Sequence, residues 1–300
     1  MSNKRKADIF LILVTAFWGI SFYLTKVALI EMGVFTLNAF RFLLAFGIVF
    51  ISLMKKTLSV NFQTLKYAVL SGIPVVISYM AYSYGILNTS ISNAAFLCCM
   101  AVLFTPIFSF LIDGTVPKIN FMIALLICIP GIAFITMDGT LSFSKGDIFC
   151  ILCAMSYALS IIIVEKGVNK SEVDAFNLGV YQLGFVGISY LILAFIFEKP
   201  TMPTTLSTWT SVLFLAIFCT GFAVIVQSIA QKHTTASNVG LIFTLEPIFA
   251  SISSYLILGE IMTSAQMIGA SAIILSIFIL EFDWEKLSHL KYLQNRVGDN

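Results

Sequence analysis

Residues 237–260 read SNVGLIFTLEPIFASISSYLILGE, an apolar run of membrane length with Glu246 near its centre and Pro247 directly after it. A charge deep in a bilayer is expensive, and a proline removes one backbone hydrogen bond. Both occur in spanning helices mainly where the helix faces a bundle interior or a watery cavity. The stretch therefore predicts a helix that faces the interior of a membrane bundle.

A weaker copy of this stretch lies upstream, which indicates a duplicated chain. Residues 92–111 read SNAAFLCCMAVLFTPIFSFL, with Thr105-Pro106 where the downstream copy has Glu246-Pro247. The sequence KADIF at 6–10 is likewise echoed by KGDIF at 145–149, an offset of 139. The offset is 145 at Ser92 and 141 at Pro106, so the first copy holds four extra residues, about one helical turn.

The composition excludes a water-soluble protein. Hydrophobic residues make up 59% of the chain and charged residues 11%, whereas a soluble domain is about a quarter charged. No basic stripe suggests a nucleic-acid partner. The six cysteines all fall in apolar runs and are interpreted as packing residues, so we expect no metal site and no cofactor.

Ten apolar segments are long enough to be membrane spans, which need about 20 residues each. They cover residues 8–29, 34–54, 66–87, 91–112, 119–137, 147–167, 175–197, 209–230, 236–258 and 263–280. With the N-terminus in the cytoplasm, 13 Lys and Arg residues lie inside and 3 outside, and Arg41 lies in the membrane. This bias predicts a multi-pass protein of the cell membrane with both termini cytoplasmic.

The predicted fold class is an all-α integral membrane protein of ten transmembrane helices, arranged as two inverted five-helix repeats. An odd number of spans per copy inserts the second copy upside down, an arrangement typical of secondary transporters. The predicted units are residues 1–138, residues 139–281 and a cytoplasmic tail at 282–300.

Several motifs together resemble the EamA-type members of the drug/metabolite transporter superfamily. They are Phe17-Trp18-Gly19, Arg41-Phe42, Thr105-Pro106, Leu245-Glu246-Pro247 and Leu258-Gly259-Glu260. The first copy departs from the pattern, because Thr105 replaces the glutamate and no Gly-Glu follows. The resemblance implies a metabolite carrier, often an exporter of amino acids or related solutes, with a cavity between the two halves.

Two charged residues lead the candidates for the solute or ion pathway. Glu246 could bind a proton or a cationic solute, hold an ion-pair partner, or accept hydrogen bonds at a bend. Arg41 could pair with Glu246, bind a solute carboxylate, or reach the outer headgroups. Their predicted depths differ by only about 5 Å at 1.5 Å per residue, so a pair is geometrically allowed.

Uncharged polar and aromatic residues form a second group, for which packing or helix-to-helix hydrogen bonding is an equal alternative. The group comprises Trp18, Tyr79, Tyr82, Asn93, Tyr157, Gln182, Gln227 and Asn238. Four prolines predict helix bends: Pro74, Pro106, Pro130 and Pro247.

The sequence thus predicts a secondary transporter of a small metabolite, such as an amino acid, that works by alternating access and exports its solute. The predicted partners are the solute and the lipid bilayer. Proton coupling through Glu246 and uncoupled facilitation both stay open, and nothing indicates an oligomeric state. The alternatives are a membrane-embedded enzyme, for which no catalytic motif is present, and a receptor or scaffold, for which the loops are too short.

Overall fold

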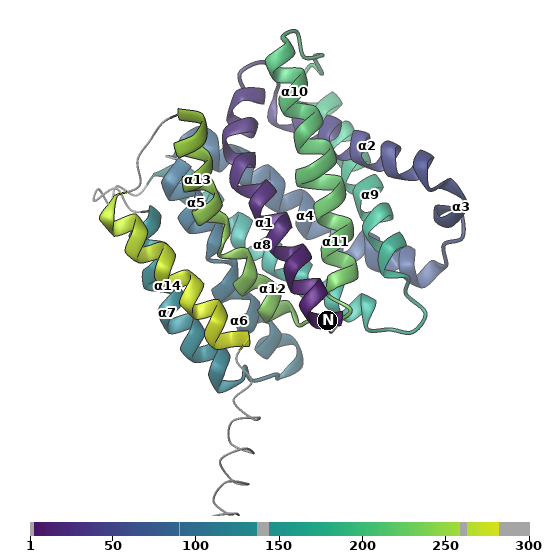
Figure 1. Cartoon of the computed structure of the whole chain (residues 1–300). Helices are drawn as coiled ribbons and strands as arrows, with labels where there is room; N and C mark the ends of the chain where they lie inside the picture. The colour runs from purple at the N-terminus through teal and green to yellow at the C-terminus, as the bar shows by residue number, and fades with distance from the viewer. Residues whose placement is uncertain (1–2, 90, 137–143, 259–262, 282–300) are drawn as a thin grey trace, which may run out of the picture.

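A computed structural model describes residues 3–89, 91–136, 144–258 and 263–281, and these residues form helices and short connections without a strand (Figure 1). The first half comprises α1 (Asn3–Ala28), α2 (Val34–Ser52), α3 (Met54–Thr57), α4 (Phe62–Asn88), α5 (Ile91–Cys99), α6 (Ala101–Asp113) and α7 (Ile119–Thr136). The second comprises α8 (Lys145–Val168), α9 (Ala175–Phe197), α10 (Leu206–Phe214), the π-helix η1 (Leu215–Phe222), α11 (Ala223–Ala230), α12 (Ala236–Phe243), α13 (Glu246–Leu258) and α14 (Ser264–Glu281).

The predicted apolar segments are helical, and eight of them are long and apolar enough to cross a membrane. The other two, in α7 and α14, give shorter apolar helices at Ile119–Phe134 and Ser264–Ile279. The structure thus shows an all-helical, multi-pass architecture with eight candidate spans in its described part. The predicted tail at 282–300 lies outside the described residues.

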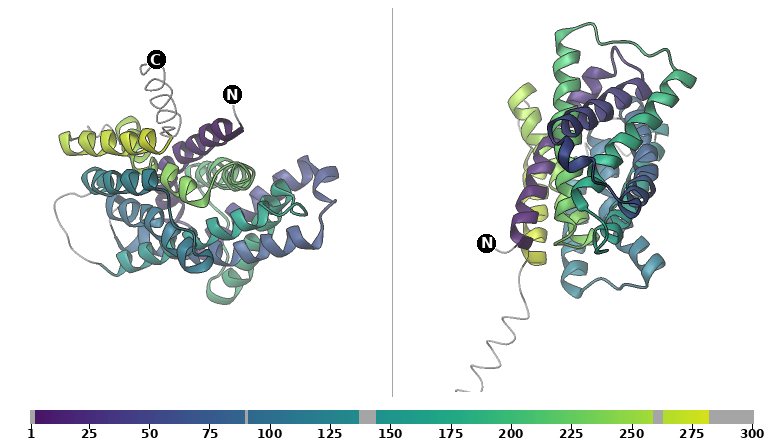
Figure 2. Two further views of the ribbon diagram at one scale, coloured as in Figure 1. Left: turned by 90° about the horizontal axis from the view of Figure 1, so that it is seen from below. Right: turned by 90° about the vertical axis from the view of Figure 1, so that its right-hand side faces the viewer.

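Helices of the two halves pack in corresponding pairs. At the sequence offset between the copies, α1 corresponds to α8, α2 to α9 and α7 to α14. Both α2 with α9 and α7 with α14 pack against each other, and the second pair lies side by side in Figures 1 and 2. The packing of α4 on α8 likewise has a counterpart in the packing of α1 on α10, η1 and α11. A two-fold relation between the halves would produce these pairs.

Two of the apolar segments are interrupted near their centres. Between α5 and α6 the Met100 amide bonds the Leu97 carbonyl at 3.2 Å, a bond of three residues instead of four. Between α12 and α13 the Thr244 and Leu245 amides bond the carbonyls three residues back, each at 3.1 Å. The turn at Leu245 lies two residues before Pro247, whereas the turn at Met100 lies six residues before Pro106. The extra turn of the first copy therefore falls between the break and the proline.

Carboxylates at one end of the bundle cap helices of the opposite half. Glu198, which follows α9, accepts hydrogen bonds from the Phe35 and Thr36 amides at the start of α2, at 3.0 and 2.8 Å. Glu31, between α1 and α2, accepts bonds from the Thr204 and Thr205 amides and hydroxyls before α10. These bonds, the Thr205 hydroxyl first, lower the pKa of Glu31 to about 2. The two carboxylates fasten the halves together reciprocally.

The other end of the bundle has a matching set of bonds between the halves. The Asp174 amide donates to Thr64 Oγ1 at 3.1 Å, and Asn177 Nδ2 donates to the Lys56 carbonyl at 3.2 Å. The Tyr181 hydroxyl donates to the Thr57 carbonyl at 2.9 Å. The flank formed by α2 and α9 is therefore tied at both ends.

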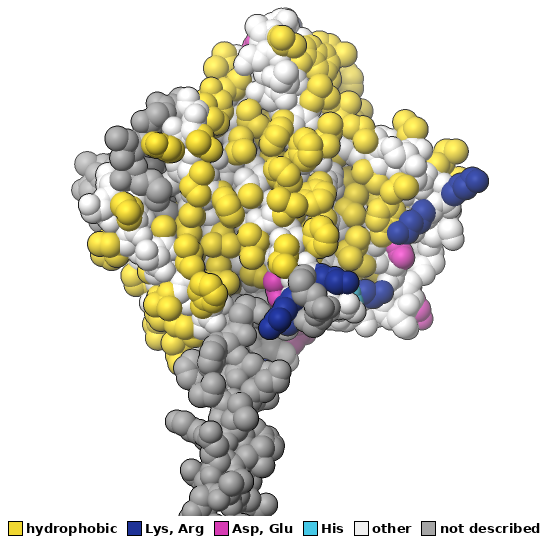
Figure 3. Space-filling model, in the orientation of Figure 1, with side chains coloured by type: hydrophobic (Ala, Val, Ile, Leu, Met, Phe, Trp, Pro, Cys, Tyr) yellow, Lys and Arg dark blue, Asp and Glu magenta, His cyan; other side chains and the backbone are white. Residues whose placement is uncertain are grey.

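The surface of the bundle suits a lipid environment. Hydrophobic side chains cover most of the face in Figure 3, and the Lys and Arg side chains visible there lie in two places, around the N-terminus and at the right-hand edge. Many large apolar side chains are exposed, for example Leu126 at 69% and Phe195 at 70%. In water such a surface would aggregate, so its natural surroundings are acyl chains.

Candidate functional site

A cavity of about 80 Å³ lies in the interior of the bundle and is lined by both halves. The first half contributes side chains from α1, α2, α4, α5 and α6, and the second from α8, α12 and α13. That volume is several times what one water molecule needs, so the cavity has room for a few waters or for part of a small solute. Its lining contains one acid, Glu246, and one base, Arg41.

Glu246 is positioned by the interruption between α12 and α13. It is the first residue of α13, and Pro247 lies in the first turn of this helix. The amides of a first turn have no partner within the helix, so the missing N–H of proline costs no helical hydrogen bond there. The amide end of a helix favours negative charge, so the turn offers the carboxylate electrostatic support inside an apolar segment. Thr244 secures the turn, because its hydroxyl donates to the Leu241 carbonyl at 2.6 Å and accepts from Cys128 Sγ at 3.3 Å.

Arg41 is 2% exposed, so its guanidinium lies inside the bundle and not at the headgroups. Nε donates to Thr220 Oγ1, and Nη2 lies 3.4 Å from the Cys219 carbonyl oxygen. The guanidinium carbon lies 4.7 Å from the centre of the Tyr79 ring, a cation–π contact. No ion pair of 4.0 Å or less joins Arg41 to Glu246 in the described part of the chain, although both line the cavity.

Aromatic rings form the wall of the cavity beside Glu246. Trp18 packs on Phe243 with ring centres 4.7 Å apart and meets Tyr157 edge-on at 5.7 Å. Trp18 Nε1 donates to the Cys219 carbonyl at 2.8 Å, and the Tyr157 hydroxyl donates to Gln227 Oε1 at 2.6 Å. These hydrogen bonds fix ring orientations, so the wall is preformed.

Six of the candidates predicted from the sequence converge on this cavity. They are Trp18, Arg41, Tyr79, Tyr82, Tyr157 and Glu246.

Three of the remaining candidates, Gln182, Gln227 and Asn238, are not among the residues that line it. Gln227 accepts the hydrogen bond of the Tyr157 hydroxyl and so orients that ring. Gln182 Nε2 donates to Ser71 Oγ at 2.9 Å and links α9 to α4. Asn238 lies in the first turn of α12, where its amide bonds Thr235 Oγ1, and the side chain of Asn93 lies outside the described residues. Pro74, Pro106 and Pro130 lie inside α4, α6 and α7, and only Pro247 adjoins a break.

Three cavity-lining cysteines were interpreted from the sequence as packing residues only. Cys98, Cys99 and Cys153 line the cavity. The sequence around a cysteine in an apolar run does not show whether its thiol lines a cavity or packs in the core. Among the described residues no group of three or more His, Cys, Asp or Glu side chains is placed to hold a metal ion.

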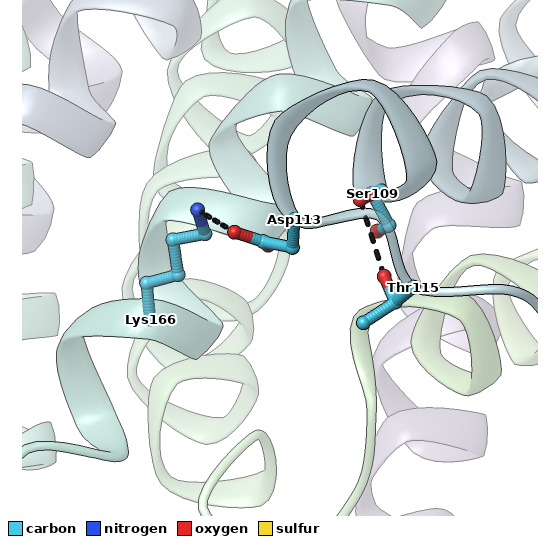
Figure 4. Close-up of polar contacts among 4 residues, drawn as sticks. All are labelled: Ser109, Asp113, Thr115 and Lys166. Carbon is cyan, nitrogen blue, oxygen red and sulfur yellow. Dashed lines mark hydrogen bonds and ion pairs between the residues drawn. The ribbon is translucent and has the colours of Figure 1, made fainter.

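An ion pair joins the two halves at the C-terminal ends of α6 and α8. Figure 4 shows Lys166 of α8 reaching Asp113 of α6, with Nζ 2.5 Å from Oδ1. The Thr115 hydroxyl donates to the Ser109 carbonyl at 3.1 Å beside it. Deeper in the bundle α6 contacts α12 directly, since a Cβ added at Gly240 would lie 3.3 Å from Thr105 Oγ1. On this side of the cavity α6 of the first half thus contacts α8 and α12 of the second.

Relatives of the chain support its assignment to a class of membrane transporters. An uncharacterized transporter of Archaeoglobus fulgidus is 28% identical over 278 residues, covering 93% of this chain and 86% of the relative. The uncharacterized transporter YoaV of Bacillus subtilis is 24% identical over 284 residues, covering 92% and 97%. A solved crystal structure aligns with a TM-score of 0.76 at 14% identity, covering 92% of this chain and 96% of that one, which shows the fold alone.

The EamA-like transporter family matches the chain twice, at residues 5–137 and 144–282. The two matches together cover nearly the whole chain and confirm the resemblance inferred from the sequence motifs. They also give the two-repeat architecture. The chain therefore belongs to the EamA-like transporter family.

Proposed function

We propose that this protein is a secondary transporter that exports a small amino acid or related metabolite across the cytoplasmic membrane by alternating access. One observation carries the proposal: both halves of the bundle line a single cavity that holds one acid, one base and an aromatic wall. A zwitterionic solute with an apolar body matches that lining, because each of its charges meets an opposite one.

Alternating access requires two halves that can rearrange around a fixed site. The paired packing of α2 with α9 and of α7 with α14 supports an inverted relation between the halves. The excess of Lys and Arg at one set of connections supports cytoplasmic termini. In this orientation Asp113 and Lys166 lie at the cytoplasmic end, where their ion pair links the two halves.

A comparison of excreted metabolites tests the proposal. Cells overproducing the protein are expected to accumulate at least one amino acid or close derivative in the medium, relative to cells with empty vector and to cells with Glu246→Ala. Each such solute is then offered to purified protein in proteoliposomes. Saturable binding without any flux would favour a receptor and contradict transport, and chemical conversion of the solute would favour an enzyme.

The Asp113–Lys166 pair yields a separate prediction about access from the cytoplasm. Both side chains are 37% exposed, and such pairs contribute about 0–1 kcal/mol, so Asp113→Asn should change the melting temperature little. It should nevertheless shift the population toward the state open to the cytoplasm, because the pair links α6 of one half to α8 of the other. We expect a few-fold faster reaction of Cys98 with an impermeant maleimide added from the cytoplasmic side, about fivefold per 1 kcal/mol.

The labelling uses a variant in which Cys98 is the only cysteine. Exchange of the two charges, Asp113→Lys with Lys166→Asp, should restore slow labelling. Lys118→Gln serves as the control, because Lys118 is exposed at the same end and forms no ion pair with a described residue. Equal labelling rates in the Asp113→Asn variant and the parent would show that the pair does not hold this side closed.

A further inference from the structure

The donors of Arg41 are unequally used. A guanidinium has five N–H bonds in a fixed fork. Nε–H is taken by Thr220 Oγ1, and one N–H of Nη2 points to the Cys219 carbonyl. Nη1 is buried and has no hydrogen-bond partner in the described structure. Arg41, which lines the cavity, therefore has N–H groups at Nη1 that no described residue accepts.

The two groups that hold Arg41 both come from the π-helix η1. A π-helix bonds each amide to the carbonyl five residues back, and such segments occur frequently at functional sites. Here the Cys219 carbonyl accepts from two donors outside its own helix, Trp18 Nε1 and Arg41 Nη2. Thr220 is 0% exposed, and its hydroxyl serves Arg41 instead of a carbonyl in its own helix. The irregular helix thus orients the cation and the neighbouring aromatic wall together.

A buried guanidinium without a neighbouring anion is costly. In the described part of the chain no carboxylate lies within 4.0 Å of it, and the Tyr79 ring offers a cation–π contact but no negative charge and no hydrogen-bond acceptor in the plane of the fork. A carboxylate is the ligand that best fits a guanidinium fork, through charge-assisted hydrogen bonds. A carboxylate on the solute would supply the missing charge and the missing acceptors at once.

We infer that the free N–H groups of Arg41 form the carboxylate subsite of the cavity, and that Thr220 and the Cys219 carbonyl of η1 position them. This inference rests on the proposed function and names the group by which the solute is recognised. The transported class is then small monocarboxylates, and Glu246 across the cavity favours those that also carry an amine. Thr220 is a positioning residue, since it acts through Arg41 and does not touch the solute.

Binding to the purified full-length protein tests the subsite. The twenty common L-amino acids are screened for thermal stabilisation, and each one that binds is compared with its α-carboxamide, which keeps the size and removes the negative charge. We expect the amide to bind at least about tenfold more weakly, because hydrogen bonds between charged groups are strong. Thr220→Val should reduce this acid-over-amide ratio toward one, whereas Thr220→Ser, which keeps the hydroxyl, should preserve it.

Ser228→Ala is the matched control. Ser228 is 1% exposed in α11, and its hydroxyl bonds only the Val224 carbonyl of its own helix at 2.9 Å. This variant should keep the full acid-over-amide ratio. If Thr220→Val fails to fold, Arg41→Lys replaces it, because lysine keeps the charge but loses the fork, and it should lower the ratio as well.

Three outcomes would overturn the inference: no amino acid binds the parent protein, the amides bind as tightly as the acids, or Thr220→Val keeps the full ratio. Flux is measured separately with the bound amino acid in proteoliposomes. Acid-selective binding without flux would contradict the proposed transport and leave the subsite intact. Equal flux of acid and amide would contradict the subsite and leave transport intact.

Discussion

Replacement of Glu246 by glutamine is expected to abolish transport driven by a pH gradient while solute binding stays measurable. Glutamine has nearly the same shape as glutamate but cannot release or take up a proton. If Glu246 carries one coupling proton, a gradient of one pH unit supplies about 1.4 kcal/mol, or about tenfold accumulation of the solute. The measurement is counterflow in proteoliposomes with and without a pH gradient. In the Glu246→Gln variant the pH gradient should no longer produce this accumulation of the solute.

The control for this experiment is Glu165→Gln. Glu165 is a half-buried carboxylate near the end of α8 that does not line the cavity, so the variant should keep its pH-driven flux. Unchanged pH dependence in Glu246→Gln would show that Glu246 carries no coupling proton. Loss of solute binding together with flux, at an unchanged melting temperature, would instead place Glu246 in direct contact with the solute.

Gly19→Val should strongly destabilise the bundle and stop transport. A Cβ at Gly19 would lie 2.5 Å from Phe249 Cβ, 2.6 Å from the Phe249 carbonyl carbon and 2.7 Å from the Ala250 nitrogen. Two of these atoms are backbone, so no rotamer change relieves the clash, and α1 must move away from α13. Overpacking costs about 1–3 kcal/mol, and we expect the upper end of that range or more. Because α13 begins with Glu246, the shift also displaces the acid of the cavity.

Melting of the purified protein in detergent micelles measures the effect, with Gly47→Ala as the control. A Cβ at Gly47 meets nothing within 4 Å, and alanine is a better helix former than glycine by about 1 kcal/mol. The control should therefore melt at the same temperature as the parent or slightly higher. A Gly19→Val variant that melts like the parent would show that α1 and α13 do not pack this closely.

The helices could be predicted from the sequence because their signal is local. Apolar length alone located α9, which spans Ala175–Phe197 as predicted, and the start of α2 at Val34. The interruption of the fourth segment was harder to place. Its proline is at Pro106, but the helix breaks six residues earlier, at Met100. A proline marks a weak point in the hydrogen-bond ladder and does not by itself fix the break.

The residues that line the cavity could be predicted only in part. Charged residues are rare in membrane segments and stand out in the sequence, whereas cysteines and small residues are common there and do not. Glu246 and Arg41 stood out as charges in apolar runs, and the structure brings both to one cavity. Cys98 and Cys153 did not stand out, since thiols are common packing residues. The π-helix that holds Arg41 was not predictable either. Nothing in the composition of residues 215–222 shows whether their amides bond the carbonyl five residues back, as in a π-helix, or four residues back, as in an α-helix.

The capping role of Glu31 has a consequence for the interpretation of acid titrations. Its pKa of about 2 lies below the ordinary value of 4.5, so the ionised form is the one that the bundle stabilises. The resulting stability is complete above about pH 4.5 and is lost progressively as the pH falls from there through about 2. Between about pH 5 and 8 this carboxylate keeps its charge, and the fastening of the two halves at that end is insensitive to protons. Any change of transport rate across that interval must therefore come from groups other than Glu31.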